Sequence, residues 1–299
     1  MRLFTLFLFS QLLIAGEVGT TGFNFLKLSG GAKEIAMGGT CLGSSKGVGA
    51  LFLNPAGVIQ PDKPQASITY LSYVADINSG FLGYTRPSER MGYGIGIAYL
   101  NSGSMKRTDI DNNDLGTFSA QYLSLQTALG IKPSPGILLG TGIKFLYATI
   151  DTFWSMGGAM DIGGLYIHKA LSMGIAIQNL GLQVKAFDEE KDPLPLNLGI
   201  GLGYKLSEEF YISLDINKPI DNRPNLKLGM EWRLHKNFAL RTGYDSMRQD
   251  LKTQGGSDIL AGFSFGMGIE HKEITLDYAY TPYLLLGNSH RISLSFWFK

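Results

Sequence analysis

Large apolar residues alternate with small or polar residues through most of the chain beyond residue 65. In residues 196–205 the even positions hold Leu196, Leu198, Ile200, Leu202 and Tyr204, whereas glycine fills most odd positions. A strict period of two is typical of a β-strand that presents one apolar face. Such segments predict fourteen strands, at residues 66–73, 80–86, 92–101, 117–130, 137–149, 158–168, 171–178, 196–205, 210–217, 225–234, 238–244, 258–269, 273–281 and 291–298.

The connections between these segments alternate between longer and shorter along the chain. The longer set includes residues 102–116, 150–157, 179–195 and 245–257, and the shorter set includes residues 87–91, 131–136 and 235–237. Bacterial outer-membrane barrels have short periplasmic turns and longer outer loops, whereas a soluble β-sandwich has no reason to alternate in this way. The predicted fold class is therefore all-β: a transmembrane antiparallel β-barrel of about 14 strands, with both termini periplasmic.

The composition agrees with a barrel in the outer membrane of a Gram-negative bacterium. Glycine accounts for 39 of 299 residues, aromatic residues for 11% and charged residues for 17%. Soluble proteins average about 7% glycine and about 25% charged residues. No apolar run of about 18 residues follows the N-terminal leader, which excludes membrane-spanning helices. The net charge of +1 offers no basic face for nucleic acid.

The first 16 residues read as a secretory signal peptide. Arg2 is followed by an apolar run up to Ile14 and then by the small residues Ala15 and Gly16, which is the order that such peptides share. We therefore expect an exported protein with three parts: a signal peptide at 1–16, an N-terminal plug or hatch at 17–62, and an outer-membrane β-barrel at 63–299.

Residues 25–57 fit neither the strand period nor a long helix. They are rich in glycine, allow two short helices, and end in a turn where Pro55 keeps Asn54 out of helical geometry. The predicted inner face of the barrel is mostly Gly, Ala and Ser, so it leaves room for a compact plug. Cys41 is the only cysteine, and its simplest role is that of a small buried apolar residue.

The runs FLKLSGGAKEIAMGG and ALFLNPAG resemble the PorV/PorQ family of outer-membrane proteins, within the wider FadL-like barrels. The matching positions are Phe25, Leu26, Gly31, Ala32, Ala36, Met37, Gly38, Gly39, Asn54, Pro55, Ala56 and Gly57. The chain departs from that family in having Lys46 where acidic residues are usual, and in ending on Lys299 rather than on Phe298.

This resemblance implies a non-enzymatic role in type IX-like protein secretion, in which the barrel receives exported cargo and passes it to surface-attachment components. It also implies a structural or gating plug motif, formed by Gly31, Ala32, Met37, Gly38, Gly39, Asn54, Pro55, Ala56 and Gly57. The implied partners are outer-membrane lipid, secreted cargo proteins and other secretion components.

The alternative is a FadL-like channel for the uptake of hydrophobic small molecules. Its candidate lining residues are Phe25, Leu28, Leu51, Phe52, Phe153 and Trp154. These side chains could equally be the core of the plug and anchors at the membrane edge, and the sequence leaves both interpretations open.

An enzyme is not expected. Three of the four histidines, His168, His235 and His271, fall in or beside predicted short turns, and only His290 lies near a long connection. No nucleophile-elbow pattern accompanies them. The acidic residues at 109–114 lack the glycine and distal glutamate of an EF-hand. No catalytic residue, metal site or cofactor is therefore predicted.

Overall fold

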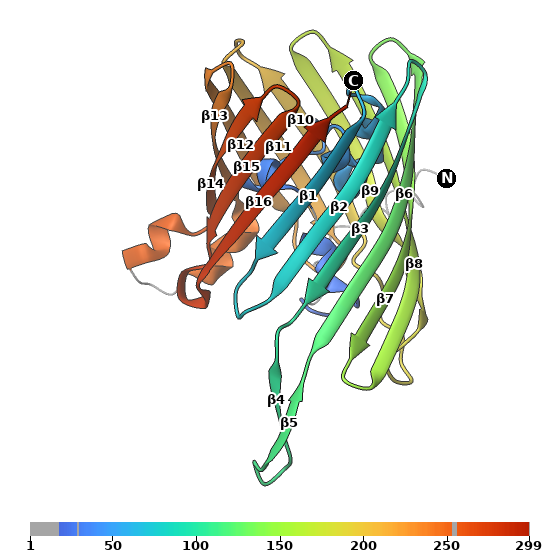
Figure 1. Ribbon diagram of the computed structural model, residues 1–299, viewed down its shortest axis with the longest axis vertical. Helices are drawn as coiled ribbons and strands as arrows, with labels where there is room; N and C mark the ends of the chain where they lie inside the picture. Colours follow the sequence, from blue (N-terminus) through green and yellow to red (C-terminus); the bar gives the residue numbers. More distant parts are fainter. Residues whose placement is uncertain (1–17, 29, 253–255, 299) are drawn as a thin grey trace, which may run out of the picture.

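The computed structural model describes residues 18–28, 30–252 and 256–298, so the expected signal peptide lies outside the described residues. Within these ranges, fourteen antiparallel strands pair in one closed barrel, and β16 pairs with β1 to complete it (Figure 1). Among the described helices, none is long and apolar enough to span a membrane.

The barrel strands follow chain order around the barrel. They are β1 (Gln65–Ser72), β2 (Asn78–Pro87), β3 (Met91–Asn101), β6 (Ala120–Ser134), β7 (Ile137–Ile150), β8 (Phe153–His168) and β9 (Leu171–Lys185). The second half consists of β10 (Asn197–Lys205), β11 (Phe210–Pro219), β12 (Asn225–His235), β13 (Phe238–Asp245), β14 (Phe263–His271), β15 (Ile274–Pro282) and β16 (Asn288–Trp297).

The remaining elements are short. The N-terminal segment contains η1 (Asn24–Leu28), α2 (Ala32–Ala36), α3 (Val48–Leu53) and η2 (Pro55–Ile59). A two-stranded ribbon, β4 (Met105–Thr108) and β5 (Asp114–Phe118), projects beyond the barrel between β3 and β6 (Figure 1). Three 3-10 helices, η3 (Ser246–Leu251), η4 (Gly256–Leu260) and η5 (Leu284–Leu286), lie in connections.

Each of the fourteen predicted strands coincides with a barrel strand, which confirms the predicted fold class. The β4–β5 ribbon was not predicted, because its residues are polar and carry no period. The ribbon tip is a tight turn in which the Asp109 carboxylate accepts hydrogen bonds from the backbone of Asp111 and Asn113. This local bonding accounts for the acidic cluster without a ligand.

The strand β9 runs to Lys185, beyond the predicted end at residue 178. Asn179 has a positive φ of 60°, and the β8–β9 register shifts between Met160 and Ile162. This bulge interrupts the alternation on which the prediction depended, so the second half of the strand was read as a loop.

All connections of one kind lie at the same end of the barrel, which defines a short-turn end and a long-loop end. The alternation has one exception. The prediction of a long connection at residues 150–157 is wrong, because Asp151 and Thr152 alone join β7 to β8. Ile150 pairs directly with Phe153, so residues from Phe153 onward belong to the barrel wall.

The outward face of the strands is apolar and the inward face is small or polar. The outward Tyr93, Ile95 and Ile97 are exposed, whereas the glycines between them face inward. The inward charges pair with one another: the Arg241 guanidinium contacts both Glu231 (2.7 Å) and Asp277 (2.6 Å). Pairing of this kind compensates for the cost of burying charge, and the outward apolar belt suits a lipid environment.

Residues 18–62 pass through the lumen, and we call this segment the plug. The sequence predicts that it starts at the short-turn end, but its described part starts at the long-loop end. There Gly22 N–H donates to Pro193 O (3.0 Å), and Lys27 forms an ion pair with Asp221. The plug then leaves the lumen at the short-turn end, just before Gln65 begins β1.

Glycines in the wall make room for the plug. A Cβ added at Gly163 would collide with the side-chain oxygen of Asn54, and one added at Gly140 would come within 2.6 Å of Ala56 Cα. A Cβ added at the neighbouring Gly164 would meet side chains only at 3.4 Å and beyond, which is ordinary contact. The small inner face is therefore matched to the plug at particular positions.

Substituting Gly163→Ala should loosen the seat of Asn54 and lower the free energy of unfolding by about 1–3 kcal/mol, as overpacked cores do. The measurement is urea unfolding in lipid vesicles, followed by tryptophan fluorescence. The control Gly164→Ala should change stability by no more than about 0.5 kcal/mol. Equal effects of the two variants would show that Asn54 does not press against this wall.

Candidate functional site

Polar side chains of the barrel wall hold the plug along its whole path. Asp215 on β11 is buried, and its Oδ2 accepts hydrogen bonds from the backbone N–H of Cys41 (2.8 Å) and of Leu42 (3.0 Å). Hydrogen bonds to an ionised acceptor are roughly twice as strong as neutral ones. This carboxylate therefore fixes the middle of the plug against the wall.

Arg291 on β16 holds the first half of the plug. Its guanidinium donates to the carbonyl oxygens of Gly30 and Leu28, the latter at 3.0 Å. It also lies 5.5 Å from the centre of the Phe81 ring. The buried Arg291 guanidinium therefore interacts both with two plug carbonyls and with the face of the Phe81 ring on β2.

Asn54 joins the two halves of the plug to the wall. Its side-chain amide donates to Leu42 O (2.9 Å) and to Gly164 O (3.3 Å), and its Oδ1 accepts from Ala56 N–H (3.2 Å). Pro55 follows at the first position of η2, where a missing N–H costs nothing. The Asn-Pro-Ala element is therefore the anchor of the plug at β8.

The other motif glycines serve close approach and turns. Gly38 and Gly39 have φ of 74° and 79°, a region that L-residues other than glycine rarely adopt. They follow α2, where Gly38 lies directly against the backbone of Tyr244 and Leu228 and Gly39 lies beside the Lys227 side chain. The structure thus gives these motif positions packing roles, and a gating role remains a prediction.

Cys41 is buried in the plug beside Leu42 and Ala176, as expected for a small apolar residue. Burial raises the pKa of the Cys41 thiol well above its usual value, and the negative charge of Asp215 acts in the same direction. A protonated thiol is a poor nucleophile, so Cys41 is inert while the plug is seated.

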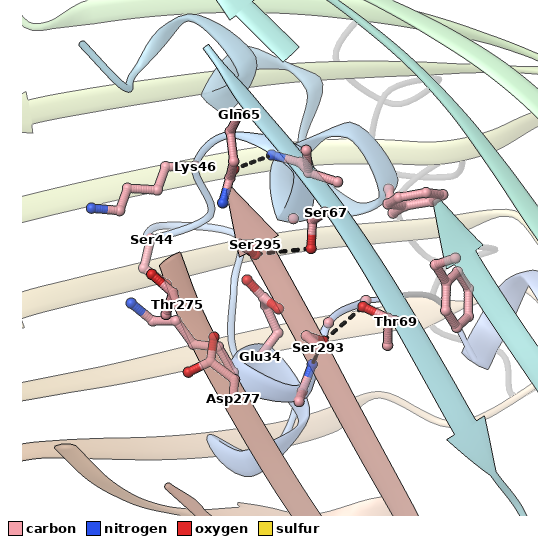
Figure 2. A pocket seen from close by; sticks show the side chains of 18 of the residues that line it. Glu34, Ser44, Lys46, Gln65, Ser67, Thr69, Thr275, Asp277, Ser293 and Ser295 are labelled. Atoms are coloured by element: carbon pink, nitrogen blue, oxygen red, sulfur yellow. Dashed lines mark hydrogen bonds between the residues drawn. The ribbon is translucent and has the colours of Figure 1, made fainter. Parts of the chain in front are cut away.

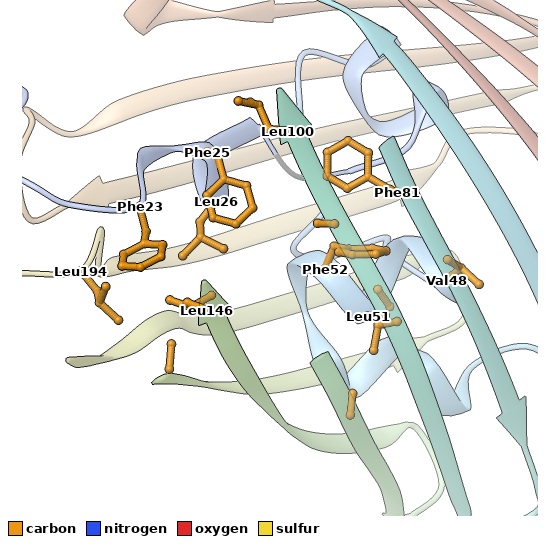
Figure 3. Close-up of a cluster of buried hydrophobic side chains, with 14 of the residues drawn as sticks. Phe23, Phe25, Leu26, Val48, Leu51, Phe52, Phe81, Leu100, Leu146 and Leu194 are labelled. Carbon is orange, nitrogen blue, oxygen red and sulfur yellow. The ribbon is translucent and has the colours of Figure 1, made fainter. Parts of the chain in front are cut away.

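An apolar cluster extends through the lumen from its long-loop end, at Phe23, into its short-turn half, at Val48 and Val58 (Figure 3). The Phe25 ring lies 5.4 Å from that of Tyr122, and the Phe52 ring lies 5.6 Å from that of Phe81 in an edge-on contact. Members from the plug are Phe23, Phe25, Leu26, Val48, Ala50, Leu51, Phe52 and Val58, and members from the wall and its loops are Phe81, Ala98, Leu100, Ala128, Leu146, Ala148, Ala159 and Leu194.

Four of the predicted lining residues meet in this cluster: Phe25, Leu51 and Phe52 are members, and Leu28 packs against it. Phe153 and Trp154 do not. They are 56% and 40% exposed at the long-loop end of β8, because the β7–β8 turn is shorter than predicted. Trp154 stands on the outward face, so its assignment as a lining residue is wrong, whereas Phe153 shares the inward side of β8 with Ser155 and its assignment stays a prediction. The Trp154 ring instead packs near Tyr147 and under the Lys185 ammonium.

Leu100 and Leu146 are cluster members that the sequence reading missed. Both stand on the inward face of their strands, where small residues otherwise prevail. A large apolar residue on a small or polar face is the signal that could have revealed them. At these two positions the inner face of the wall is apolar and contacts the cluster.

Three cavities follow one another along the lumen beside the plug. The first, about 200 Å³, lies towards the long-loop end. The second, about 110 Å³, lies between α2 and the inner faces of β1, β15 and β16 (Figure 2). The third, about 480 Å³, opens at the short-turn end.

Plug side chains separate these cavities. Glu34 and Phe52 line both the first and the second, and Lys33 and Lys46 line both the second and the third. The positive charge of Lys33 is the main cause that lowers the pKa of Lys46. The three cavities therefore adjoin one another at plug side chains.

Known structures share this fold, although no protein-family model and no curated protein matches the sequence. The toluene transporter TodX of Pseudomonas putida superposes with a TM-score of 0.62 at 13% identity, covering 89% of this chain and 96% of TodX. The toluene transporter TbuX of Ralstonia pickettii gives 0.64 at 14% identity, covering 93% of this chain and 100% of TbuX.

A FadL homologue of Pseudomonas aeruginosa gives a TM-score of 0.58 at 12% identity, covering 89% of this chain and 97% of the homologue. Identities this low show the fold alone, which matches FadL-like outer-membrane barrels. Nothing in these comparisons bears on the PorV/PorQ resemblance, which stays a prediction.

Replacing Arg291 by Met should release the start of the plug, because the carbonyls of Gly30 and Leu28 lose their donor. Loss of hydrogen bonds from a charged group costs about 1.5–3 kcal/mol each, so local opening should become at least about tenfold more frequent. Hydrogen–deuterium exchange of residues 30–37 measures it.

The matched control is Arg233→Met, which removes a half-exposed arginine without contacts to these carbonyls. It should leave exchange in residues 30–37 unchanged. If Arg291→Met also leaves it unchanged, Arg291 does not hold the plug.

Proposed function

We propose that the protein is an outer-membrane channel for the uptake of hydrophobic small molecules. The apolar cluster that extends through the lumen from its long-loop end is the observation that carries the proposal. Half of its residues belong to the plug, so an apolar molecule can replace plug contacts with its own. Burial of apolar surface contributes about 25 cal/mol per Å², which suffices to draw such a molecule out of water.

The comparisons support the same class of function. TodX and TbuX are described as toluene transporters, and their fold is shared across most of this chain. The outer membrane suits the outward apolar belt and the closed barrel. Long loops would then face the outside, and the short turns and Phe298 would face the periplasm.

Passage requires the plug to move. Its helices α2 and α3 have only five and six residues, and isolated helices that short are not stable by themselves. The plug therefore depends on wall contacts, and a ligand that weakens those contacts can shift it. A shift of Glu34 and Phe52 would join the first two cavities, and a shift of Lys33 and Lys46 would open the third.

The secretion role implied by the PorV/PorQ resemblance rests on the N-terminal motif alone. In this structure the motif residues make the turns and wall contacts that fix the plug in the lumen. No further feature of the described chain favours a cargo protein. Deletion of the gene distinguishes the two functions, because a secretion component should leave cargo in the periplasm and a small-molecule channel should not.

Phe25→Asn should slow the uptake of labelled toluene or fatty acid by about tenfold, since burial of a Phe side chain contributes about 1.5–3 kcal/mol. Initial uptake is measured in a Gram-negative host without its own channel for these compounds. Heat-modifiable migration on gels verifies folding.

Phe145→Asn is the control, because Phe145 stands on the outward, exposed face of β7. It should transport at the wild-type rate. Uptake no faster than in cells with an empty vector, or an equal effect of both substitutions, contradicts the proposed function.

A further inference from the structure

Four amide side chains form a row on the inner wall near the long-loop end. Gln178, Asn197, Asn217 and Asn225 stand on the consecutive strands β9, β10, β11 and β12, and Gln178 pairs with Asn197 and Asn217 with Asn225 in the strand register. Asn197 Nδ2 donates to Gln178 Oε1 (2.7 Å) and to Asn217 Oδ1 (3.0 Å). We call these residues the amide row.

The row leaves polar atoms without a protein partner among the described residues. These atoms are Asn197 Oδ1, Asn217 Nδ2 and Asn225 Oδ1. Asn217 and Asn225 are each only 6% exposed, and unsatisfied polar groups at such depth are costly. Along the wall, these atoms are in turn a hydrogen-bond acceptor on Asn197, a donor on Asn217 and an acceptor on Asn225.

The amide row lines the cavity of about 200 Å³, together with Asn179. The plug lines the same cavity with the apolar side chains of Leu26, Phe52 and Leu53, and Gln178 Nε2 donates to Leu53 O (2.7 Å). Two of these, Leu26 and Phe52, are also members of the apolar cluster. An apolar cavity of about 150 Å³ can hold benzene, so this space admits one substituted ring or a short chain.

Carboxylates outnumber cations around the cavity. Lys27 pairs with Asp221, and Lys144 pairs with Asp161 at 2.7 Å. Lys227 stands opposite Asp215 on one side and Asp245 on the other in the strand register. Glu34 adds one further carboxylate to the lining. Among the described residues, three lysines and five carboxylates thus surround the cavity, so an anionic ligand is disfavoured and a neutral molecule fits better.

From this arrangement we infer that the cavity binds a neutral hydroxyl-bearing apolar molecule in preference to a plain hydrocarbon. A hydroxyl group both donates and accepts, and so can meet the amide row at any of its three open atoms. The apolar part of the molecule then contacts Phe52 and the rest of the plug wall. This deepens the proposed channel function by naming its substrate class.

Binding can be measured without transport, by ¹⁹F NMR of the full-length protein in lipid nanodiscs. The probes are 4-fluorobenzyl alcohol, 4-fluorotoluene and 4-fluorobenzoate, which share a ring and differ in one substituent. The alcohol should bind at least about tenfold more tightly than the toluene, because a site with buried hydrogen-bonding groups rejects analogues that lack the matching group. The benzoate should bind most weakly.

Asn217→Leu and Asn225→Leu each remove part of the amide row and should abolish the preference for the alcohol. Asn288→Leu is the control, because Asn288 is exposed and bonds to Tyr280 outside the lumen. Folding of each variant is verified by heat-modifiable migration, and either folded variant of the row decides the question.

Equal affinities for the alcohol and the toluene, tighter binding of the benzoate, or retention of the preference in the row variants would overturn the inference. The proposed function fails separately. If uptake is absent while the alcohol still binds at the row, the protein has this binding site but is no channel.

Discussion

The structure depends on one constraint: in lipid, every backbone N–H and C=O must find its partner within the protein. A closed antiparallel barrel satisfies this constraint, and here β16 returns to β1 to complete it. Closure at fourteen strands has a consequence for the interior. Barrels of eight strands fill their interior with wall side chains, whereas larger ones enclose a space. That space must be filled by water or by protein, and the plug fills most of it.

The plug and the wall are complementary in shape and in bonding. Wall glycines such as Gly140 and Gly163 admit plug backbone at distances that any side chain would prevent. Wall charges then bind groups that a short irregular segment cannot satisfy by itself: Asp215 binds two plug N–H groups and Arg291 binds two plug carbonyls. Among the described residues, the fit is incomplete at the amide row, where Asn197 Oδ1, Asn217 Nδ2 and Asn225 Oδ1 have no protein partner.

The alternation of apolar and small residues was sufficient to predict all fourteen barrel strands. One face of each strand must be apolar towards lipid, whereas the other must be small or polar towards the plug. It failed where the alternation is interrupted, as at the Asn179 bulge and the polar β4–β5 ribbon.

Phe153 and Trp154 were placed in a loop because the length of one connection was misjudged. Phe25 and Phe52 were recognised as lining residues because they are large and apolar in a segment without a period. The amide row was beyond prediction, because Asn197, Asn217 and Asn225 are brought together only by the register of separate strands.

The central claim is that residues 18–62 are packed inside the barrel and held there by its wall. Alkylation of Cys41 tests it most directly, because Cys41 is the only cysteine and lies buried at the middle of the plug. The protein is folded in lipid vesicles and treated with a water-soluble maleimide, and the rate is compared with that of the chain unfolded in urea. The account predicts that Cys41 reacts at least about 100-fold more slowly in the folded protein, since both burial and a raised thiol pKa suppress the reaction. Reaction at a similar rate in both states would contradict it, because the plug would then lie outside the lumen.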